Sequence, residues 1–471
     1  MKVKSIHTLY IVYCIDTEGP LYESLEATFE RITSTFDIEV NFTKENLELL
    51  QEGKCPKGYK ITESILKEIK KFVSSKLLTY KKDWNNLDNM WKSCFSRKFR
   101  NKNIFLDDNK NGLIYNFFVM DHVGFSYNNP RRRSYGYNII FDYYLSLIKN
   151  LKSKDKIYWH FHPLHFTRDA HKSASSYTYS WDTIYEIIAR RIIDRNFFPC
   201  ANRPGFHTER PDIHNFLEMW IPFDYANQSM IKEEEIKQRD VMGGRFGDWG
   251  RAPSDWSVYH PDYDDYQNIG DCRRVIGKCL NIGTRLRTIN EDEIRAAFIE
   301  ARNSGRAILS FANHDWRDIK DDLIGTYKTI KKIKGEFSDV KIINSSAGDA
   351  MRCVLFENTS YNNFDWDINC KEDERYLKIE IDVKKGKTFS PQPFLAIKTI
   401  EGNYYHDNFD IQLPFKKFSY VFDNLTIDPK ILDTIGIGTC DGYGYPHIIR
   451  VYLKNGKVKE IEKVKISSMF R

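Results

Sequence analysis

The sequence lacks a membrane-spanning segment and a cysteine spacing typical of a disulfide framework. No uninterrupted apolar run in the 471 residues is long enough to cross a bilayer. The nine cysteines are an odd number and include no Cys-x-x-Cys pair, which indicates reduced thiols and a cytoplasmic protein. The apolar run near the N-terminus lacks a small-residue cleavage site, so we interpret it as a strand and not as a signal peptide.

The sequence also lacks a strong imbalance of charge. A formal net charge of +6 is small for 471 residues, and there is no basic tail or arginine-rich helix. Nucleic acid is therefore not an expected partner. Hydrophobic residues make up 41% and charged residues 29% of the chain, as in an ordinary globular protein, and the length suffices for two or three domains.

Apolar, β-favouring runs alternate with amphipathic stretches through the first three quarters of the chain. Strands are expected at residues 10–15, 113–121, 156–162, 221–223, 307–311 and 340–343. Helices are expected at residues 23–36, 137–151, 180–196, 290–303 and 318–333. This alternation predicts an α/β fold with a parallel sheet, either doubly wound or an irregular (β/α)7-type barrel.

The predicted α/β domain covers residues 1–352 and has one insertion. Residues 41–102 are polar, contain helical stretches and have the character of a subdomain inserted between core strands. From residue 353 to 471, short alternating strands lie between Gly, Asp and Pro turns, which predicts a β-sandwich. Such a module either holds carbohydrate or packs on a catalytic domain.

A long aromatic loop interrupts the alternation at residues 241–271. We expect this loop to cover a site and to contact substrate, with Trp249 and Tyr259 as the contacting side chains. The alternative is an irregular subdomain with a small core of its own.

The first strand runs directly into two carboxylates, Asp16 and Glu18, before Gly19 and Pro20 turn the chain away. Parallel α/β proteins place their chemistry at the carboxyl ends of strands. Residues 16 and 18 lie on one face of an extended segment, so they can bind a metal together or divide into one ligand and one general base. Asp121 ends the 113–121 run in the same way and is a candidate for substrate binding.

A histidine cluster lies at the end of the 156–162 run. On a strand, His160 and His162 point to the same side, which is a well-known way to hold Zn²⁺ or a similar ion. His165 follows Pro163 and is a further candidate ligand. The alternative is that these are ordinary histidines of a strand.

His314 and Asp315 follow the apolar run at residues 307–311 and so lie at another carboxyl end. A histidine there can act as a general acid towards a leaving group, with Asp315 or another acid fixing its tautomer. Alternatively, Asp315 is the N-cap of the helix that begins near Asp318.

The order of these motifs resembles that of the polysaccharide deacetylase superfamily, also called the NodB-homology family. Asp-x-Glu, Trp-His-x-His-Pro and a late His-Asp-x-Arg are similar to a WbmS-like branch tied to bacterial surface-polysaccharide gene clusters. The resemblance covers about residues 1–350. It implies a NodB-like barrel, with Asp16 as catalytic base, Glu18 as metal ligand and His314 as catalytic acid.

The same resemblance implies that His160 and either His162 or His165 complete the metal site. Arg203, within Asn202-Arg203-Pro204-Gly205-Phe206, matches the family's arginine motif. In the family the two acids of the first motif are adjacent and the two histidines are four residues apart. Here Thr17 separates the two acids, and the histidine spacings are two, three and five residues. Which histidines bind metal, and whether Asp16 and Glu18 exchange roles, therefore stay open.

The function that the resemblance implies is metal-dependent removal of an N-acetyl group from a nucleotide-linked or lipid-linked acetamido sugar, in O-antigen or capsule synthesis, with Zn²⁺ as the expected metal. Two alternative hypotheses stay open. One is a metallohydrolase acting on an ester or a non-sugar amide. The other is a carbohydrate-binding protein whose barrel has lost its metal.

Overall fold

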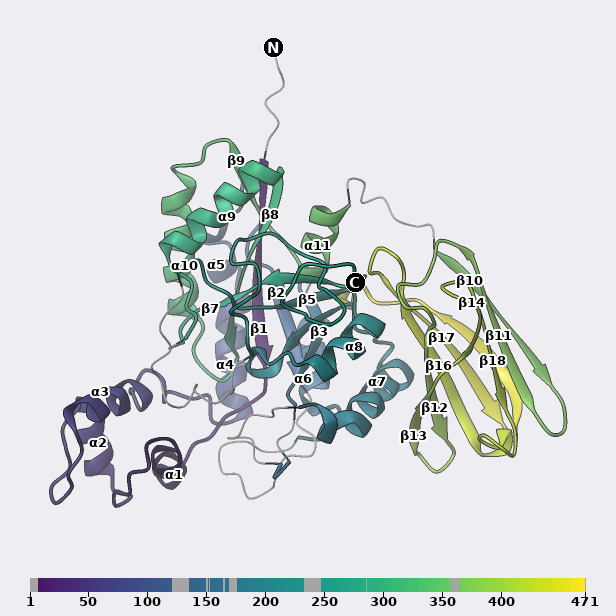
Figure 1. The fold of residues 1–471 in the computed structure, drawn as a ribbon, viewed down its shortest axis with the longest axis horizontal. Coiled ribbons are helices and arrows are strands. Elements are labelled where there is room, and N and C mark those ends of the chain that lie inside the picture. Colours follow the sequence, from purple (N-terminus) through teal and green to yellow (C-terminus); the bar gives the residue numbers. More distant parts are fainter. Residues whose placement is uncertain are drawn as a thin grey trace, which may run out of the picture.

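The chain folds around β1 (His7–Thr17), which lies at the centre of Figure 1. The computed structural model describes residues 7–120, 135–149, 151, 153–163, 166–168, 176–232, 247–284, 286–356 and 364–470. One edge of β1 pairs with β8 (Arg306–His314). The other edge is shared by β9 (Val340–Asn344) and β2 (Tyr115–Met120). All three pairings are parallel, which explains the nearly continuous apolar run of β1, since both faces of such a sheet are covered.

The parallel strands form a nearly closed barrel. The remaining strands of the sheet are β3 (Lys156–Phe161), β4 (Ala201–Pro204), β5 (Phe223–Asn227), β6 (Val275–Lys278) and β7 (Leu280–Asn281). The strand order is β6-β5-β4-β3-β2-β1-β8-β7, with β9 off this path. Only Cys279 separates β6 from β7, so one short stretch of chain joins the two ends of the path. The predicted parallel α/β barrel is confirmed at this level.

Amphipathic helices surround the barrel (Figure 1). They are α6 (Ile139–Lys149), α7 (Trp181–Arg195), α8 (Pro211–Trp220), α9 (Glu291–Ser304), α10 (Lys320–Lys334) and α11 (Ala347–Leu355). Helix α9 illustrates the pattern, because it buries Ile294, Ala297, Phe298 and Ala301 at helical spacing. Its N-cap is Asn290, whose side chain accepts a hydrogen bond from the Glu293 amide.

The helical segment after β1 divides into two parts. Helices α1 (Leu25–Phe36), α2 (Lys44–Glu52) and α3 (Glu63–Phe72) share a small hydrophobic cluster and lie to one side of the barrel in Figure 1. Helix α4 (Trp84–Phe95) instead packs into the main core, and the short α5 (Arg97–Arg100) and η1 (Asn103–Phe105) follow it. The inserted region therefore begins with α1, before the expected residue 41, and its last helices belong to the barrel core.

The C-terminal region consists of two antiparallel sheets. One sheet has the order β10 (Asp365–Glu372), β11 (Leu377–Lys385), β15 (Lys417–Phe422), β14 (Asp410–Leu413). The other has the order β13 (Tyr404–Asp407), β12 (Phe394–Thr399), β16 (Leu432–Cys440), β17 (Pro446–Lys454), β18 (Lys457–Val464). Alternate residues of β11 and β16 meet in one buried cluster between the sheets.

The second of these sheets packs closely on the barrel. Strands β12, β13 and β16 contact helix α7, and Gly436 and Gly438 of β16 face Ile192 on that helix. A Cβ atom at residue 438 would lie 2.9 Å from Ile192 and 2.6 Å from the Phe198 ring. The absence of side chains at these two positions therefore permits the close approach of the sheet.

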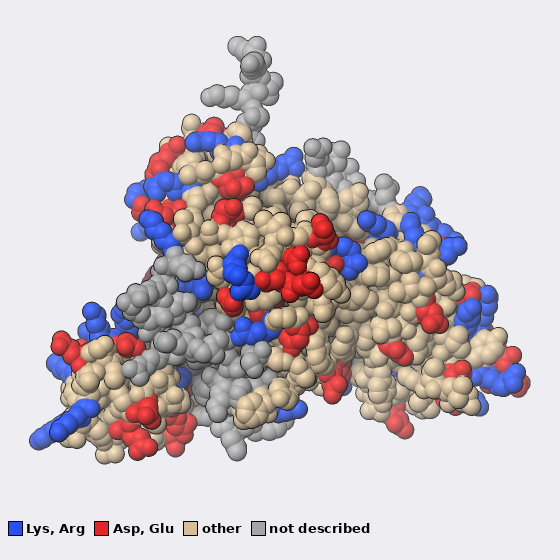
Figure 2. All heavy atoms as spheres, in the orientation of Figure 1, with Lys and Arg blue, Asp and Glu red and all other residues tan. Residues whose placement is uncertain are grey.

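The surface shows no strong segregation of charge on the face seen in Figure 2, where acidic and basic side chains are interspersed. Among the described residues, no helix is both long enough and apolar enough to cross a membrane.

Candidate metal centre

Four parallel strands bring the predicted functional residues to one end of the barrel. In the sheet register, Asp16 of β1 lies opposite His314 of β8, and His160 of β3 lies opposite Arg203 of β4. Glu18 and His162 follow the ends of β1 and β3 directly. The carboxyl ends of these strands therefore form one site, as the sequence predicts.

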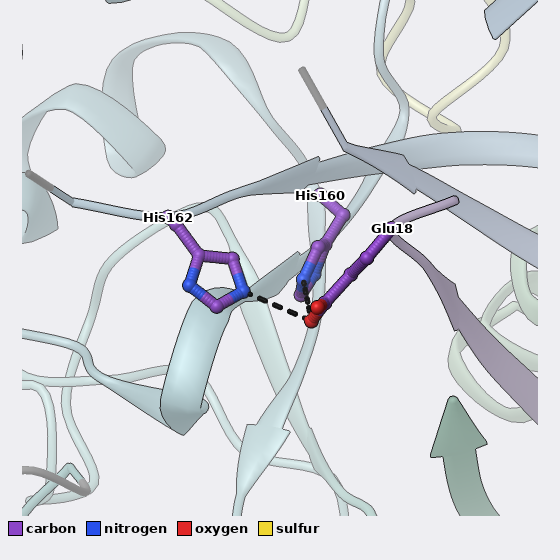
Figure 3. Close-up of side chains that lie close together, drawn as sticks. All are labelled: Glu18, His160 and His162. Atoms are coloured by element: carbon purple, nitrogen blue, oxygen red, sulfur yellow. Dashed lines mark hydrogen bonds and ion pairs between the residues drawn. The ribbon is translucent and has the colours of Figure 1, made fainter. Parts of the chain in front are cut away.

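Glu18, His160 and His162 form a buried group that could hold a metal ion. Each offers one ligand atom, and these atoms all lie within 4.8 Å of one another. Figure 3 shows the two imidazole rings and the carboxylate pointing toward a common centre. The His162 Nε2 lies 3.2 Å and the His160 Nε2 4.0 Å from Glu18 Oε1. Two ligands of a tetrahedral ion with bonds of about 2.1 Å are separated by about 3.4 Å, so the spacing fits a metal.

The hydrogen bonding of His160 also fits a metal ligand. Its Nδ1 lies 2.6 Å from the carbonyl oxygen of Arg203, and because a carbonyl only accepts, Nδ1 is the protonated nitrogen. The Nε2 atom then presents its lone pair, and it is buried without a hydrogen-bond partner among the described residues. Burial lowers the pKa of His160 to about 3, which keeps the ring neutral, as metal ligation requires.

The turn after β4 leaves space for the His162 ring. A Cβ atom at Gly205 would lie 2.3 Å from two atoms of the His162 ring, so only glycine fits there. The Phe206 ring meets the same imidazole edge to face, with centroids 4.7 Å apart. These contacts fix the plane of the His162 ring.

Asp16 and Arg203 form a buried ion pair beside the candidate metal ligands. The guanidinium donates from Nε to Asp16 Oδ1 at 2.7 Å and from Nη2 to Oδ2 at 3.1 Å. Burial by itself would raise the pKa of Asp16, but the charge and hydrogen bonds of Arg203 outweigh it and lower that pKa well below its ordinary value. Asp16 is therefore ionised at neutral pH and can accept a proton.

His314 approaches the group from β8, the strand that pairs with β1. Its Nε2 lies 3.7 Å from Glu18 Oε1, and its side chain is 22% exposed, whereas that of Glu18 is 1% exposed. The His314 ring also packs against Trp316, with centroids 4.9 Å apart. His314 is thus placed between the buried carboxylate and the outside of the site.

Asp315 has a different place from the one expected. Its two carboxylate oxygens accept hydrogen bonds from the backbone amides of Glu18, at 2.9 Å, and Gly19, at 3.0 Å. Helix α10 begins at Lys320 with Ile319 as its N-cap, so Asp315 does not cap that helix. Neither a tautomer-fixing nor a capping role follows from these contacts; Asp315 supports the backbone of the first motif.

A further histidine, His207, lies at the site and is not among the predicted residues. Its Nδ1 is 3.4 Å from Arg203 Nη2, and burial, followed by the Arg203 charge, lowers its pKa well below the usual range. Phe206 and His207 both have left-handed backbones, with φ of 55° and 51°, which is strained for non-glycine residues. The signal available in the sequence is that His207 comes four residues after Arg203.

Trp249 and Tyr259, which are predicted to contact substrate, are not among the residues of the candidate metal group. Trp249 and Tyr259 are buried in a small cluster that packs the 247–271 segment on Ala226 of β5 and Ile276 of β6, and the Trp249 Nε1 donates to the His207 carbonyl at 3.0 Å. This burial favours the alternative of an irregular segment with a small core, and the Trp249 contact supports the His207 turn. His165 and Asp121 lie outside the described residues.

No protein-family model, no curated protein and no solved structure matches the chain.

Proposed function

We propose that the protein is a metal-dependent hydrolase that removes the N-acetyl group from an acetamido sugar in bacterial cell-surface polysaccharide biosynthesis. The observation that supports this most directly is the buried Glu18–His160–His162 group, with Asp16 and His314 beside it. The Asp16 Oδ1 lies 3.9 Å from His160 Nδ1, and the His314 Nε2 lies 3.7 Å from Glu18 Oε1. A proton acceptor and a proton donor thus flank the candidate ligands.

A divalent ion held by Glu18, His160 and His162 would act as a Lewis acid on a carbonyl group and would lower the pKa of water. Zn²⁺ suits a set of two imidazoles and one carboxylate. The same three-residue donor set leaves room for a substrate atom, which is the arrangement of catalytic rather than structural zinc sites.

The chain's own residues would transfer two protons during hydrolysis. Asp16, kept ionised by Arg203, accepts a proton from the attacking water as its oxygen bonds to the carbonyl carbon. His314 then donates a proton to the amide nitrogen as the carbon–nitrogen bond breaks. The products are acetate and a free amino sugar, and the next turnover needs the proton to pass from Asp16 back to His314.

The substrate class is supported by the motifs and not by the geometry alone. Asp16-Thr17-Glu18, Trp159-His160-Phe161-His162-Pro163 and His314-Asp315-Trp316-Arg317 resemble motifs of the polysaccharide deacetylase superfamily. In the three-dimensional arrangement, Arg203 contacts the carboxylate that this resemblance assigns as the base. The motif resemblance is the reason to propose a sugar acetamide, rather than another amide or an ester, as the substrate.

Acetate release from a panel of acetyl compounds tests the proposal. We expect the full-length protein to release acetate and a free amine from nucleotide-linked or lipid-linked acetamido sugars, and to lose this activity after dialysis against a chelator. Re-addition of Zn²⁺ should restore it. Release from O-acetyl sugars or N-acetyl amino acids alone would overturn the sugar amide assignment, and full activity in the presence of chelator would overturn the metal dependence.

A further inference from the structure

A fully buried chain of hydrogen bonds runs from the inserted helix α4 to the backbone of the candidate metal ligand Glu18. Its central residue, Asp315, is 0% exposed. One carboxylate oxygen accepts from the Glu18 amide at 2.9 Å, and the other accepts from the Gly19 amide at 3.0 Å. A single side chain thus accepts from two consecutive amide groups.

Two further side chains, from helices α6 and α4, extend this series of hydrogen bonds beyond the Asp315 carboxylate. The Tyr144 hydroxyl, on α6, donates to Asp315 Oδ2 at 2.6 Å. The Trp91 Nε1, on α4, donates to the Tyr144 hydroxyl oxygen at 3.2 Å. Both side chains are 0% exposed, so no competing water reaches these bonds, and each group depends on the next for its partner.

The two hydrogen bonds from the consecutive amides of Glu18 and Gly19 fix the orientation of the backbone at the ligand. Buried backbone amides need acceptors, and here the acceptor determines how the peptide between Glu18 and Gly19 is oriented. Gly19 has a left-handed backbone with φ of 77°, so the chain turns sharply just after the ligand. The direction in which the Glu18 side chain leaves the backbone therefore depends on where Asp315 lies.

We propose that Asp315 is a positioning residue for the metal ligand Glu18, held in place by Tyr144 and Trp91, and that this chain of hydrogen bonds sets the metal affinity of the site. The inference rests on the metal site of the proposed function but not on its substrate. It also gives α4 a role: the inserted segment contributes Trp91 to the support of the metal centre.

The test is the Zn²⁺ dissociation constant, measured by competition with a chromogenic chelator on the full-length protein. We expect Asp315→Asn to weaken binding by about 10- to 100-fold, as for loss of other groups that support metal ligands. An amide can present only one oxygen acceptor, so one of the two backbone amides loses its partner. Tyr144→Phe, which keeps the ring and removes only the hydroxyl, should weaken binding by several-fold.

Tyr143→Phe is the matched control. Tyr143 is the neighbouring residue of α6, and its hydroxyl donates to Asp88 Oδ1 at 2.9 Å instead of to Asp315. This variant should keep the wild-type dissociation constant, although it too loses one hydrogen bond. A purely structural role for Asp315 would lower the unfolding temperature of the metal-free protein without changing the dissociation constant.

The outcomes separate this inference from the proposed function. If the wild type binds no Zn²⁺, the metal site and the inference both fail. If the wild type binds Zn²⁺ and Asp315→Asn and Tyr144→Phe bind it equally well, the inference fails while the proposed function stands. Should Asp315→Asn not fold, Tyr144→Phe decides: an unchanged dissociation constant overturns the inference, and a weakened one supports it.

Discussion

Arg203 holds Asp16 by two hydrogen bonds, one to each carboxylate oxygen, of 2.7 and 3.1 Å. The third nitrogen of the guanidinium, Nη1, donates to the Tyr225 carbonyl at 2.8 Å. Arg203 is thereby fixed to strand β5 while it fixes the carboxylate of strand β1. The ion pair keeps Asp16 charged and also holds its orientation two residues before Glu18.

Replacing Asp16 separates the role of base from the role of metal ligand. We expect Asp16→Asn to lower kcat by at least about 10²-fold, since an amide cannot accept the proton, and to retain bound metal. The free energy of unfolding should fall by about 3–5 kcal/mol, because a buried Arg203 loses its counter-charge. Steady-state kinetics, metal analysis and denaturant unfolding measure the three quantities. Loss of metal together with activity would instead make Asp16 the ligand and Glu18 the base.

The loss of rate on replacing His314 should depend on whether the leaving group must be protonated. Because we assign it as the general acid, His314→Gln should lower kcat for an acetamido sugar by about 10²- to 10⁴-fold. A p-nitrophenyl ester has a leaving group that departs without protonation. The loss of rate for this ester should be far smaller, and an equal loss for both substrates would contradict the assignment.

The contact between the C-terminal sheets and the barrel depends on glycine at residue 438. Gly438→Ala should destabilise the protein by about 1–3 kcal/mol, since the new methyl group would overlap Phe198 and Ile192. Gly325→Ala, within α10, is the matched control, because nothing lies within 4 Å of its Cβ position; it should stabilise by up to about 1 kcal/mol. Denaturant unfolding compares the two, and equal effects would argue against a close interface.

The same interface should make stability depend on pH. His406 packs on Phe394, with ring centroids 4.0 Å apart, and on Tyr185, at 4.6 Å, and burial lowers the pKa of His406 from 6.5 to about 4. Between these values the unfolded chain takes up a proton that the folded protein does not. The contribution of neutral His406 to the free energy of unfolding is therefore complete above pH 6.5 and is lost as the pH falls towards 4.

The size of this effect is about 2 kcal/mol, allowing for the partial exposure of the ring. It can be isolated by measuring the unfolding free energy of the wild type and of His406→Phe between pH 7.5 and 4.5. Phenylalanine keeps the stacking and does not titrate, so the variant should lose less stability on acidification. Parallel curves for the two proteins would show that His406 does not titrate on unfolding.

The barrel was predictable from the sequence where its strands are apolar throughout. The run of β1 and the alternation of strands and helices around it identify a parallel α/β fold. Strands β4 and β6 were missed, because they contain polar residues such as Arg203 and Lys278. These side chains are buried through partners far away in the sequence: Arg203 pairs with Asp16, and Lys278 with Glu293. Hydrophobic periodicity cannot reveal such strands.

The candidate site was predictable to the extent that strand ends could be located. Glu18, His160 and His162 follow from the two-residue period of a strand and from the rule that carboxyl ends meet. Asp315 was assigned from its neighbour His314, but its contacts are with Glu18 and Gly19, which only the fold brings near. The burial of Trp249 was not predictable for the same reason, since the contact between Trp249 and His207 depends on tertiary structure.

The metal content of the protein as purified, without added metal, tests the central claim most directly. Elemental analysis should find about one transition-metal ion per chain in the wild type and far less in His160→Ala and His162→Ala. His447→Ala is the control, because His447 pairs with Asp441 in the C-terminal region, at 3.1 Å, and this variant should keep its metal. A wild type that holds no metal and takes up none on titration with Zn²⁺, or full metal content in both His160→Ala and His162→Ala, would contradict the account.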